Sequence, residues 1–181
     1  MAMDINLKDG QRAQRKQLIT VAEWTEGTTT TPLREILGVR TEDSSIDLNP
    51  DIETTTDILG YTYTDVNKTE PQQTLDPSFV IGGSALKKYL VQAMLKNDIQ
   101  AYNGAFNVYI ITAFISETTG ELTPSTSYYA VKHAGCSIIP TSIGGDNYVD
   151  LPIEVHFSNK ITEGSVDKLS DDFVFQAEVT V

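Results

Sequence analysis

The sequence is poor in cysteine and histidine, two side chains that many enzymes and metal sites use. Among 181 residues there is one cysteine, Cys136, and there are two histidines, His133 and His156. A single cysteine cannot form an intramolecular disulfide, so the chain fits a reducing cytoplasm. Three such donors do not make a metal site. The common phosphate-binding, dinucleotide-binding, zinc-protease and serine-hydrolase motifs are also missing. We therefore expect neither an enzyme nor a cofactor.

His133 and Cys136 are the one pair whose residue types could form a nucleophilic site. They stand three positions apart in a segment that we expect to be a strand, where successive side chains alternate between faces. This spacing places them on opposite faces and disfavours a Cys–His pair. His156 stands two positions after Glu154 in an alternating segment, and we expect it to be solvated or part of an interface.

Long hydrophobic runs and positive charge are scarce as well. No window approaches 18 apolar residues, and the first 16 residues are polar, so we expect neither a membrane span nor a secretory signal. Lysine and arginine number 13 against 25 acidic residues, a formal charge of −12. A chain this acidic is repelled by nucleic acid and by anionic membranes.

The acidity is concentrated in one stretch. Residues 41–80 contain nine acidic side chains and one basic side chain, Lys68, a net charge of −8. The same stretch alternates like a strand at Ile52, Thr54, Thr56 and Ile58, so we interpret residues 41–69 as a long acidic β-excursion. Its acids lack the spacing and the turn glycine of a calcium loop.

One amphipathic helix is predicted, over residues 84–98. An apolar stripe recurs at helical spacing, and we expect it to pack on the rest of the protein. The stripe consists of Leu86, Tyr89, Leu90, Ala93 and Met94. We expect Lys87, Lys88, Gln92 and Lys96 on the other face. Ser84 is the expected N-cap, and Lys96 suits the negative end of the helix dipole.

The rest of the chain predicts strands. Threonine is abundant, with 22 residues, and the chain also has eight tyrosines and six phenylalanines, which favour pleated surfaces. Residues 104–117 are apolar on both faces, which indicates a central strand covered on two sides. Residues 125–139 predict a strand with a bulge at Gly135. The expected fold is mainly β, a sandwich or barrel with the helix packed on it. We expect a polar N-terminal arm at 1–16 and a single domain at 17–181.

The order of these elements resembles the tail tube proteins (major tail proteins) of long-tailed, non-contractile bacteriophages. Residues 44–60 resemble the protruding loop region of that family, 70–83 the strand that leads into the helix, and 84–96 the helix itself.

The resemblance implies a structural subunit that assembles into stacked rings of six. The rings would form an acidic conduit through which DNA is ejected without specific binding. Implied partners are further copies of the chain and other tail proteins (tape measure, tail terminator and distal tail), with no membrane. The protein would be made in the host bacterial cytoplasm and reside in the virion tail. Asp47, Asp51, Glu53 and Asp57 are the candidate residues for contacts between rings.

The alternation of the late strands adds candidates for the wall of the conduit. Glu154 and Glu178 stand on the polar rows of two such segments, opposite side chains that we expect in the core. They can equally face the outer solvent, and the sequence leaves both readings open.

Two alternatives to a non-contractile tail tube remain. One is the inner tube subunit of a contractile injection system, which uses a similar subunit. The other is a carbohydrate-binding β-sandwich, in which tyrosines stack on sugar rings. Its candidates are Tyr61, Tyr63, Tyr128 and Tyr129.

Overall fold

The computed structural model describes residues 3–27, 30–39, 41, 44–116 and 127–178. Its elements in chain order are β1 (Asp4–Ile5), η1 (Arg15–Gln17), β2 (Leu18–Trp24), β3 (Leu33–Ile36), β4 (Ile46–Asp47), β5 (Pro50–Thr56), β6 (Thr62–Thr69), β7 (Gln72–Leu75), α1 (Ala85–Lys96), η2 (Ile99–Ala101), β8 (Phe106–Ser116), β9 (Tyr128–Pro140), β10 (Ile153–His156), β11 (Ile161–Val166) and β12 (Phe175–Ala177). The prediction of a mainly β fold with one amphipathic helix is confirmed.

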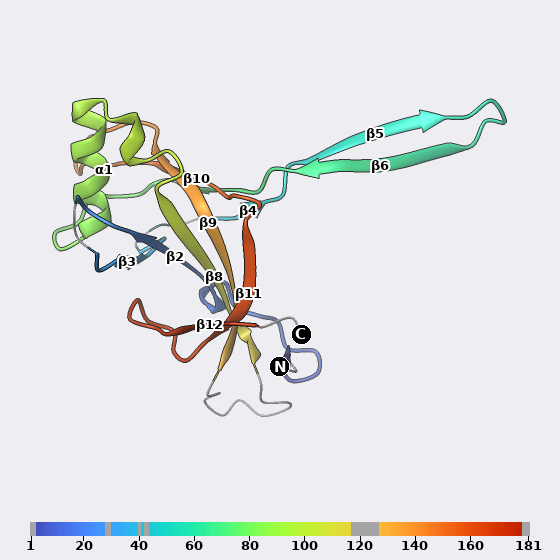
Figure 1. The fold of residues 1–181 in the computed structure, drawn as a ribbon, viewed down its shortest axis with the longest axis horizontal. Coiled ribbons are helices and arrows are strands. Elements are labelled where there is room, and N and C mark those ends of the chain that lie inside the picture. The colour runs from blue at the N-terminus through green and yellow to red at the C-terminus, as the bar shows by residue number, and fades with distance from the viewer. Residues whose placement is uncertain (1–2, 28–29, 40, 42–43, 117–126, 179–181) are drawn as a thin grey trace.

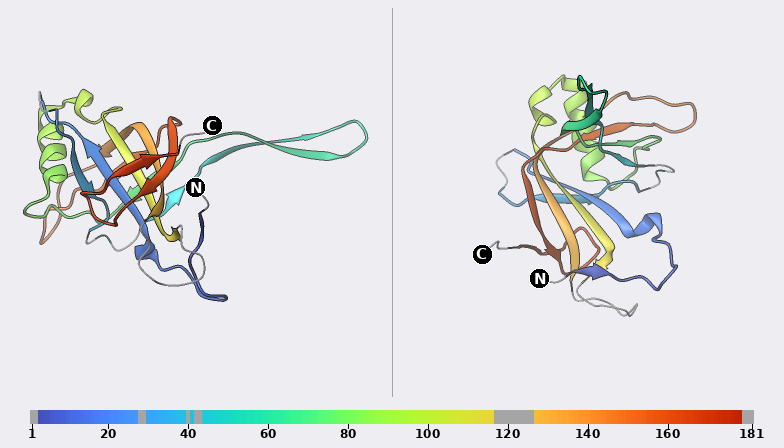
Figure 2. Two further views of the ribbon diagram at one scale, coloured as in Figure 1. Left: turned by 60° about the horizontal axis from the view of Figure 1, so that its bottom comes forward. Right: turned by 90° about the vertical axis from the view of Figure 1, so that its right-hand side faces the viewer.

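An antiparallel, strongly curled sheet forms the body of the protein (Figures 1 and 2). Its main path runs β3-β2-β8-β9-β10-β7-β4. β9 pairs with β8 along one edge, and along its other edge with β11 and then β10. β12 extends the sheet beyond β11, and β1 pairs with the end of β8. The polar segment predicted as an N-terminal arm thus includes a short strand on the sheet.

β8 is the central strand that its sequence predicts, because both of its faces are covered. Phe106 and Val108 belong to a core that also contains α1, while Tyr109 and Ile111 belong to a second core on the opposite face. Phe173, in the segment before β12, closes this second core. We call the face of the sheet that carries the first core the helix face, and the face that carries the second core the far face.

Gly135 forms the predicted bulge in β9, and it changes which side chains share a face. Phe106 pairs with Cys136 and Asn107 with Ala134, so Gly135 is the extra residue, with φ +76°. Because Val108 pairs with His133, the bulge returns Cys136 to the same face as His133. The prediction that His133 and Cys136 face opposite sides is therefore wrong.

Helix α1 forms where its sequence predicts and ends within two residues of the predicted limits. The Ser84 hydroxyl accepts the Lys87 N–H, and Asn97 terminates the helix in the left-handed conformation with φ 53°. Leu86, Leu90 and Ala93 are buried in the helix-face core. Tyr89 and Met94 are partly buried against the same core, where the Tyr89 ring contacts Trp24 and Phe106.

Lys87 lies inside the protein, although the helical pattern places it on the solvent face. Its Nζ donates to the Ser78 hydroxyl and, at 3.3 Å, to the Ser78 carbonyl. From β3, the Glu35 carboxylate accepts the Leu86 N–H and the Ser84 hydroxyl. Burial lowers the Lys87 pKa to about 8, against the opposing effect of the Glu35 and Asp150 charges. The N-terminal turn of the helix is therefore held by a polar cluster drawn from distant segments.

Candidate functional site

The most unusual feature of the molecule is a two-stranded hairpin that leaves the sheet between β4 and β7. Among the described residues, β5 and β6 pair only with each other, and they extend well beyond the body (Figures 1 and 2). Every residue from 50 to 69 except Asp57 is exposed, and Asp57 is half-buried. At the base, the Glu70 N–H donates to the Leu48 carbonyl, and the Asn49 side chain donates to the Glu70 carbonyl. We call residues 50–69 the hairpin.

Asp57 organises the tip of the hairpin. Its carboxylate accepts the backbone N–H groups of Leu59 and Tyr61 and the Tyr63 hydroxyl. These bonds, first of all the one from Tyr61, lower the Asp57 pKa. The turn they hold exposes Ile58 completely and Leu59 to 75%. Exposed apolar groups at the end of a projection are typical of surfaces that contact other proteins.

Strand register divides the hairpin into a neutral face and a charged face. The neutral face presents cross-strand pairs of β-branched residues: Ile52–Val66, Thr54–Thr64 and Thr56–Thr62. The charged face presents Asp51–Lys68, Glu53–Asp65 and Thr55–Tyr63.

Glu53 and Asp65 stand directly opposite each other, and like charges in this position destabilise a strand pair. Within the described part of the chain, neither carboxylate has an ion-pair partner. An isolated two-stranded hairpin is at best marginally stable in water.

The four residues predicted for contacts between rings occupy different levels of this feature. Asp47 lies on β4 in the body and accepts from the Ser45 hydroxyl. Asp51 and Glu53 lie along β5, and Asp57 lies at the tip. The sequence pattern missed the exposed apolar residues of the tip. The available signal was Ile58-Leu59 followed by Gly60, an apolar pair next to a turn glycine.

The two candidates for the conduit wall are not brought together. Glu154 pairs with Ile139 on β9, on the far face, and its carboxylate lies 3.3 Å from His156 Nε2. Glu178 stands two residues after Gln176. Gln176 pairs with Ser165, and Ser165 pairs with Tyr129, on the helix face of the sheet. One face of the sheet can therefore present only one of the two carboxylates.

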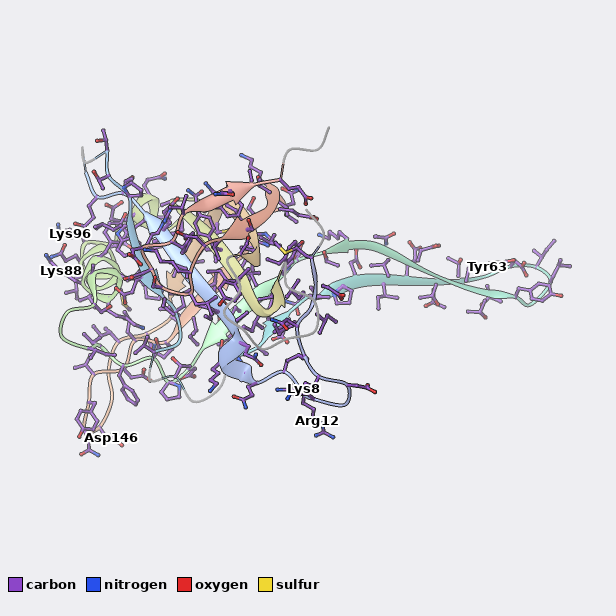
Figure 3. The ribbon with its side chains drawn as sticks, turned by 90° about the horizontal axis from the view of Figure 1, so that it is seen from below. Lys8, Arg12, Tyr63, Lys88, Lys96 and Asp146 are labelled. Carbon is purple, nitrogen blue, oxygen red and sulfur yellow. The ribbon has the colours of Figure 1, made fainter. Side chains whose placement is uncertain are left out.

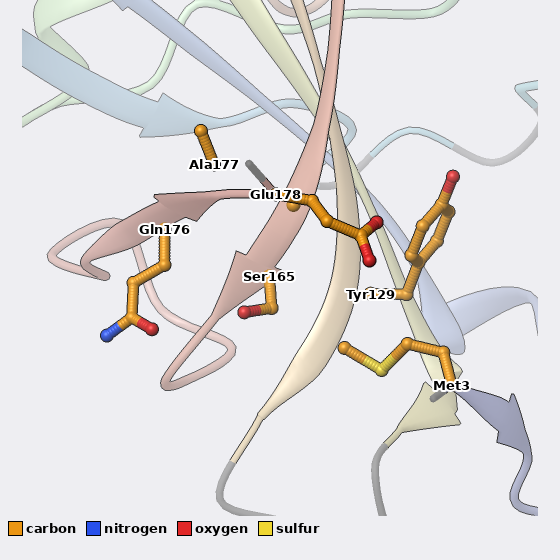
Figure 4. A pocket seen from close by; sticks show the side chains of 7 residues that line it. Met3, Tyr129, Ser165, Gln176, Ala177 and Glu178 are labelled. Carbon is orange, nitrogen blue, oxygen red and sulfur yellow. The ribbon is translucent and has the colours of Figure 1, made fainter. Parts of the chain in front are cut away.

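Glu178 also lines a small pocket of about 80 Å³ (Figure 4). The pocket lies at the edge where β11 and β12 meet, and its lining also includes Met3, Tyr129, Ser165 and Gln176. Burial, followed by the charge of Glu163, raises the Tyr129 pKa, and Glu178 adds to the effect. A pocket of this size accommodates a few water molecules or one side chain.

His133 and Cys136 share a face but do not form a nucleophilic pair. The Cys136 thiol donates to the His133 backbone carbonyl, and His133 Nδ1 bonds the Ser158 carbonyl at 2.8 Å. Burial raises the Cys136 pKa, which favours the unreactive thiol.

The four tyrosines that could stack on sugar rings do not gather at one site. Tyr61 and Tyr63 are on the hairpin, and Tyr128 and Tyr129 lie in β9 on opposite faces. No group of three or more His, Cys, Asp or Glu side chains suited to a metal ion occurs among the described residues. In the same residues, no helix is long and apolar enough to cross a membrane.

Comparisons with known proteins return structural neighbours only. No protein-family model and no curated protein matches the sequence. The chain is similar in structure to a component of the anti-feeding prophage baseplate, with 12% identity, a TM-score of 0.49 and coverage of 85% of this chain and 96% of the other.

A second neighbour comes from the sheath and tube terminator of an extracellular contractile injection system, with 16% identity, a TM-score of 0.42 and coverage of 84% and 96%. A third comes from the tube-terminating cap of the anti-feeding prophage, with 19% identity, a TM-score of 0.42 and coverage of 88% and 94%.

Proposed function

We propose that the chain is a structural subunit of a phage-like tail tube that assembles with copies of itself into stacked rings of six. The observation that carries this proposal is the hairpin. It is a projection that pairs with no other described part of the subunit, and it has an apolar tip and two opposed carboxylates along its length. Another chain that covers such a projection stabilises it. The resemblance of residues 44–96 to tail tube proteins supports the same role.

Electron microscopy of the purified protein tests this proposal. At high concentration the wild type should form rings and tubes. A variant in which a Gly-Gly turn replaces residues 50–69 should fold but form no long tubes, because Asn49 and Glu70 already lie side by side at the base.

Ile58→Ser/Leu59→Ser is the matched variant, since it keeps the hairpin and removes only the apolar tip. Normal tubes from the hairpin-deleted variant would refute the role of the hairpin. A wild type that stays monomeric at every concentration would refute the tube itself.

The charge of the chain supports a conduit that DNA passes through without binding. Each chain carries −12, so a ring of six carries −72 formally. Phosphate is repelled by such a surface and slides along it.

Because Glu154 and Glu178 lie on opposite faces, Glu154→Lys and Glu178→Lys should differ. The variant whose lysine faces the lumen should slow DNA ejection at low salt, and the effect should fade as salt shortens the Debye length to about 8 Å. Normal ejection by both variants would place both acids outside the conduit wall.

A further inference from the structure

Helix α1 carries a stripe that no other described part of the subunit covers. Lys88, Gln92, Leu95 and Lys96 recur at helical spacing on the solvent side, and Ile99 continues the stripe into η2. Leu95 is 73% exposed and Ile99 is 54% exposed. We call these five residues the α1 stripe.

The stripe is basic in an acidic protein. Helix α1 contains three lysines and no acidic residue. Lys87 is buried, and within the described residues Lys88 and Lys96 form no ion pair. Two acids lie near this end of the stripe: Asp98, just beyond the helix, and Glu26, whose charge acts on Tyr89 together with that of Asp98.

A shallow groove of about 350 Å³ runs beside the stripe. Its lining includes Tyr89, Gln92, Ala93, Lys96 and Asp98. It is open enough to receive side chains from another molecule, and Lys96 stands at its edge.

The hairpin, at the other end of the molecule, is complementary to the α1 stripe in charge and in apolar character. Its tip is apolar, with Ile58 and Leu59 exposed, and its net charge is −3 over residues 50–69. Glu53 and Asp65 are opposed like charges that a cation from outside would relieve. Figures 1 and 3 show α1, with Lys88 and Lys96, at one end of the long axis and the hairpin, with Tyr63, at the other.

We infer that the α1 stripe is the acceptor for the hairpin of a second copy of this chain. The apolar tip contacts Leu95 and Ile99, and the carboxylates of Glu53 and Asp65 pair with Lys88 and Lys96. The two surfaces lie at opposite ends of the subunit, so the contact is heterologous and repeats without closing. This inference rests on the proposed function and adds the surface that receives the hairpin.

Charge exchange between two variants tests the inference directly. Lys88→Glu/Lys96→Glu reverses the acceptor, and Glu53→Lys/Asp65→Lys reverses the hairpin. Each variant alone brings like charges together at every repeat of the contact. The concentration at which tubes appear should therefore rise about tenfold or more.

An equimolar mixture of the two variants should recover tubes of alternating composition. The unchanged hairpin of the first then meets the unchanged lysines of the second, and the reversed pair is also complementary. Lys8→Glu is the control, since Lys8 lies away from both surfaces (Figure 3). The buried Trp24 reports by its fluorescence that each variant is folded.

The outcomes separate the inference from the proposed function. Wild-type tubes together with normal assembly of Lys88→Glu/Lys96→Glu would overturn the acceptor assignment and leave the tube intact. Two defective variants whose mixture does not recover would overturn the pairing of these charges. Failure of the wild type to assemble would overturn the tube, and the acceptor with it.

Discussion

The ion pair between Glu23 and Arg34 fastens the far face of the sheet, and its removal should be costly. Arg34 Nε and Nη2 donate to one Glu23 oxygen at 2.7 and 2.6 Å, while Asn107 and Tyr109 donate to the other. Arg34 Nη1 also donates to the Phe173 carbonyl, and its guanidinium lies 4.4 Å from the centre of the Phe173 ring. One side chain thus joins β2, β3 and the segment before β12.

Arg34→Met should lower the free energy of unfolding by about 3 kcal/mol at pH 7. Removing one partner of a buried pair costs about 3–5 kcal/mol, and the value lies at the low end because Arg34 remains 22% exposed. Urea unfolding followed by the fluorescence of Trp24, the one tryptophan in the chain, measures the loss.

The pH dependence of the stability provides a second, independent test of this prediction. Burial alone would raise the Glu23 pKa, but the hydrogen bonds from Asn107 and Arg34 and the Arg34 charge outweigh it and lower the pKa. In the wild type this group stabilises the fold above its ordinary pKa, and the contribution is lost as pH falls through the lowered value. Arg34→Met removes the Arg34 hydrogen bond and charge, so the Glu23 pKa rises, and the penalty seen at pH 7 should shrink as pH falls through the raised pKa, by about 1.4 kcal/mol per unit of pKa.

Two controls accompany the measurement. Glu23→Gln/Arg34→Met should be more stable than Arg34→Met, because no unpaired carboxylate remains buried. Arg12→Met, at an exposed position, should change stability by less than about 0.5 kcal/mol. A loss below about 1 kcal/mol for Arg34→Met, independent of pH, would refute the reasoning.

Three further predictions concern the helix face. Leu90→Ala should cost about 2–5 kcal/mol in urea unfolding, because Leu90 is fully buried; a loss below about 1 kcal/mol would contradict the packing of α1. Because burial lowers the Lys87 pKa to about 8, the buried charge opposes folding below that pH, and the cost is relieved as pH rises toward 10.5. The stability of the wild type relative to Lys87→Met should therefore increase over that range of pH. Cys136 should resist a thiol reagent at pH 8 in the native protein and react after unfolding; rapid native reaction would contradict its burial.

Patterns confined to one element were predictable from the sequence. The helix, its Ser84 cap and the covered strand β8 follow from local periodicity and capping chemistry. The long acidic β-excursion was recognisable from its alternation and charge. Its protrusion from the body was expected from the length and acidity of the segment and from its resemblance to a protruding loop, because alternation alone predicts a strand without saying what the strand pairs with.

Contacts between distant segments explain the predictions that were wrong. Helical spacing assigned Lys87 to solvent, but Ser78 and Leu151 supply carbonyls at the start of the helix, and Glu35 reaches the same turn from β3. No pattern within residues 84–98 contains that information.

The bulge at Gly135 explains a second wrong prediction, which treated β9 as a regular strand. The sequence marked the glycine correctly, yet His133 and Cys136 were assigned to opposite faces by counting as if the strand were regular. One extra residue reverses the alternation beyond it, so every residue of β9 after Gly135 presents the face opposite to the one that an even count gives. The reversal agrees with the position of Glu154 on the far face, since Ile139, its partner on β9, lies beyond the bulge. Alternation along β10 gives the same result, because Glu154 stands between Ile153 and Val155, which are buried in the helix-face core. Pairing with β9 and alternation along β10 thus agree on the far face for Glu154, opposite to the face of Gln176, so Glu154→Lys and Glu178→Lys probe different faces of the sheet.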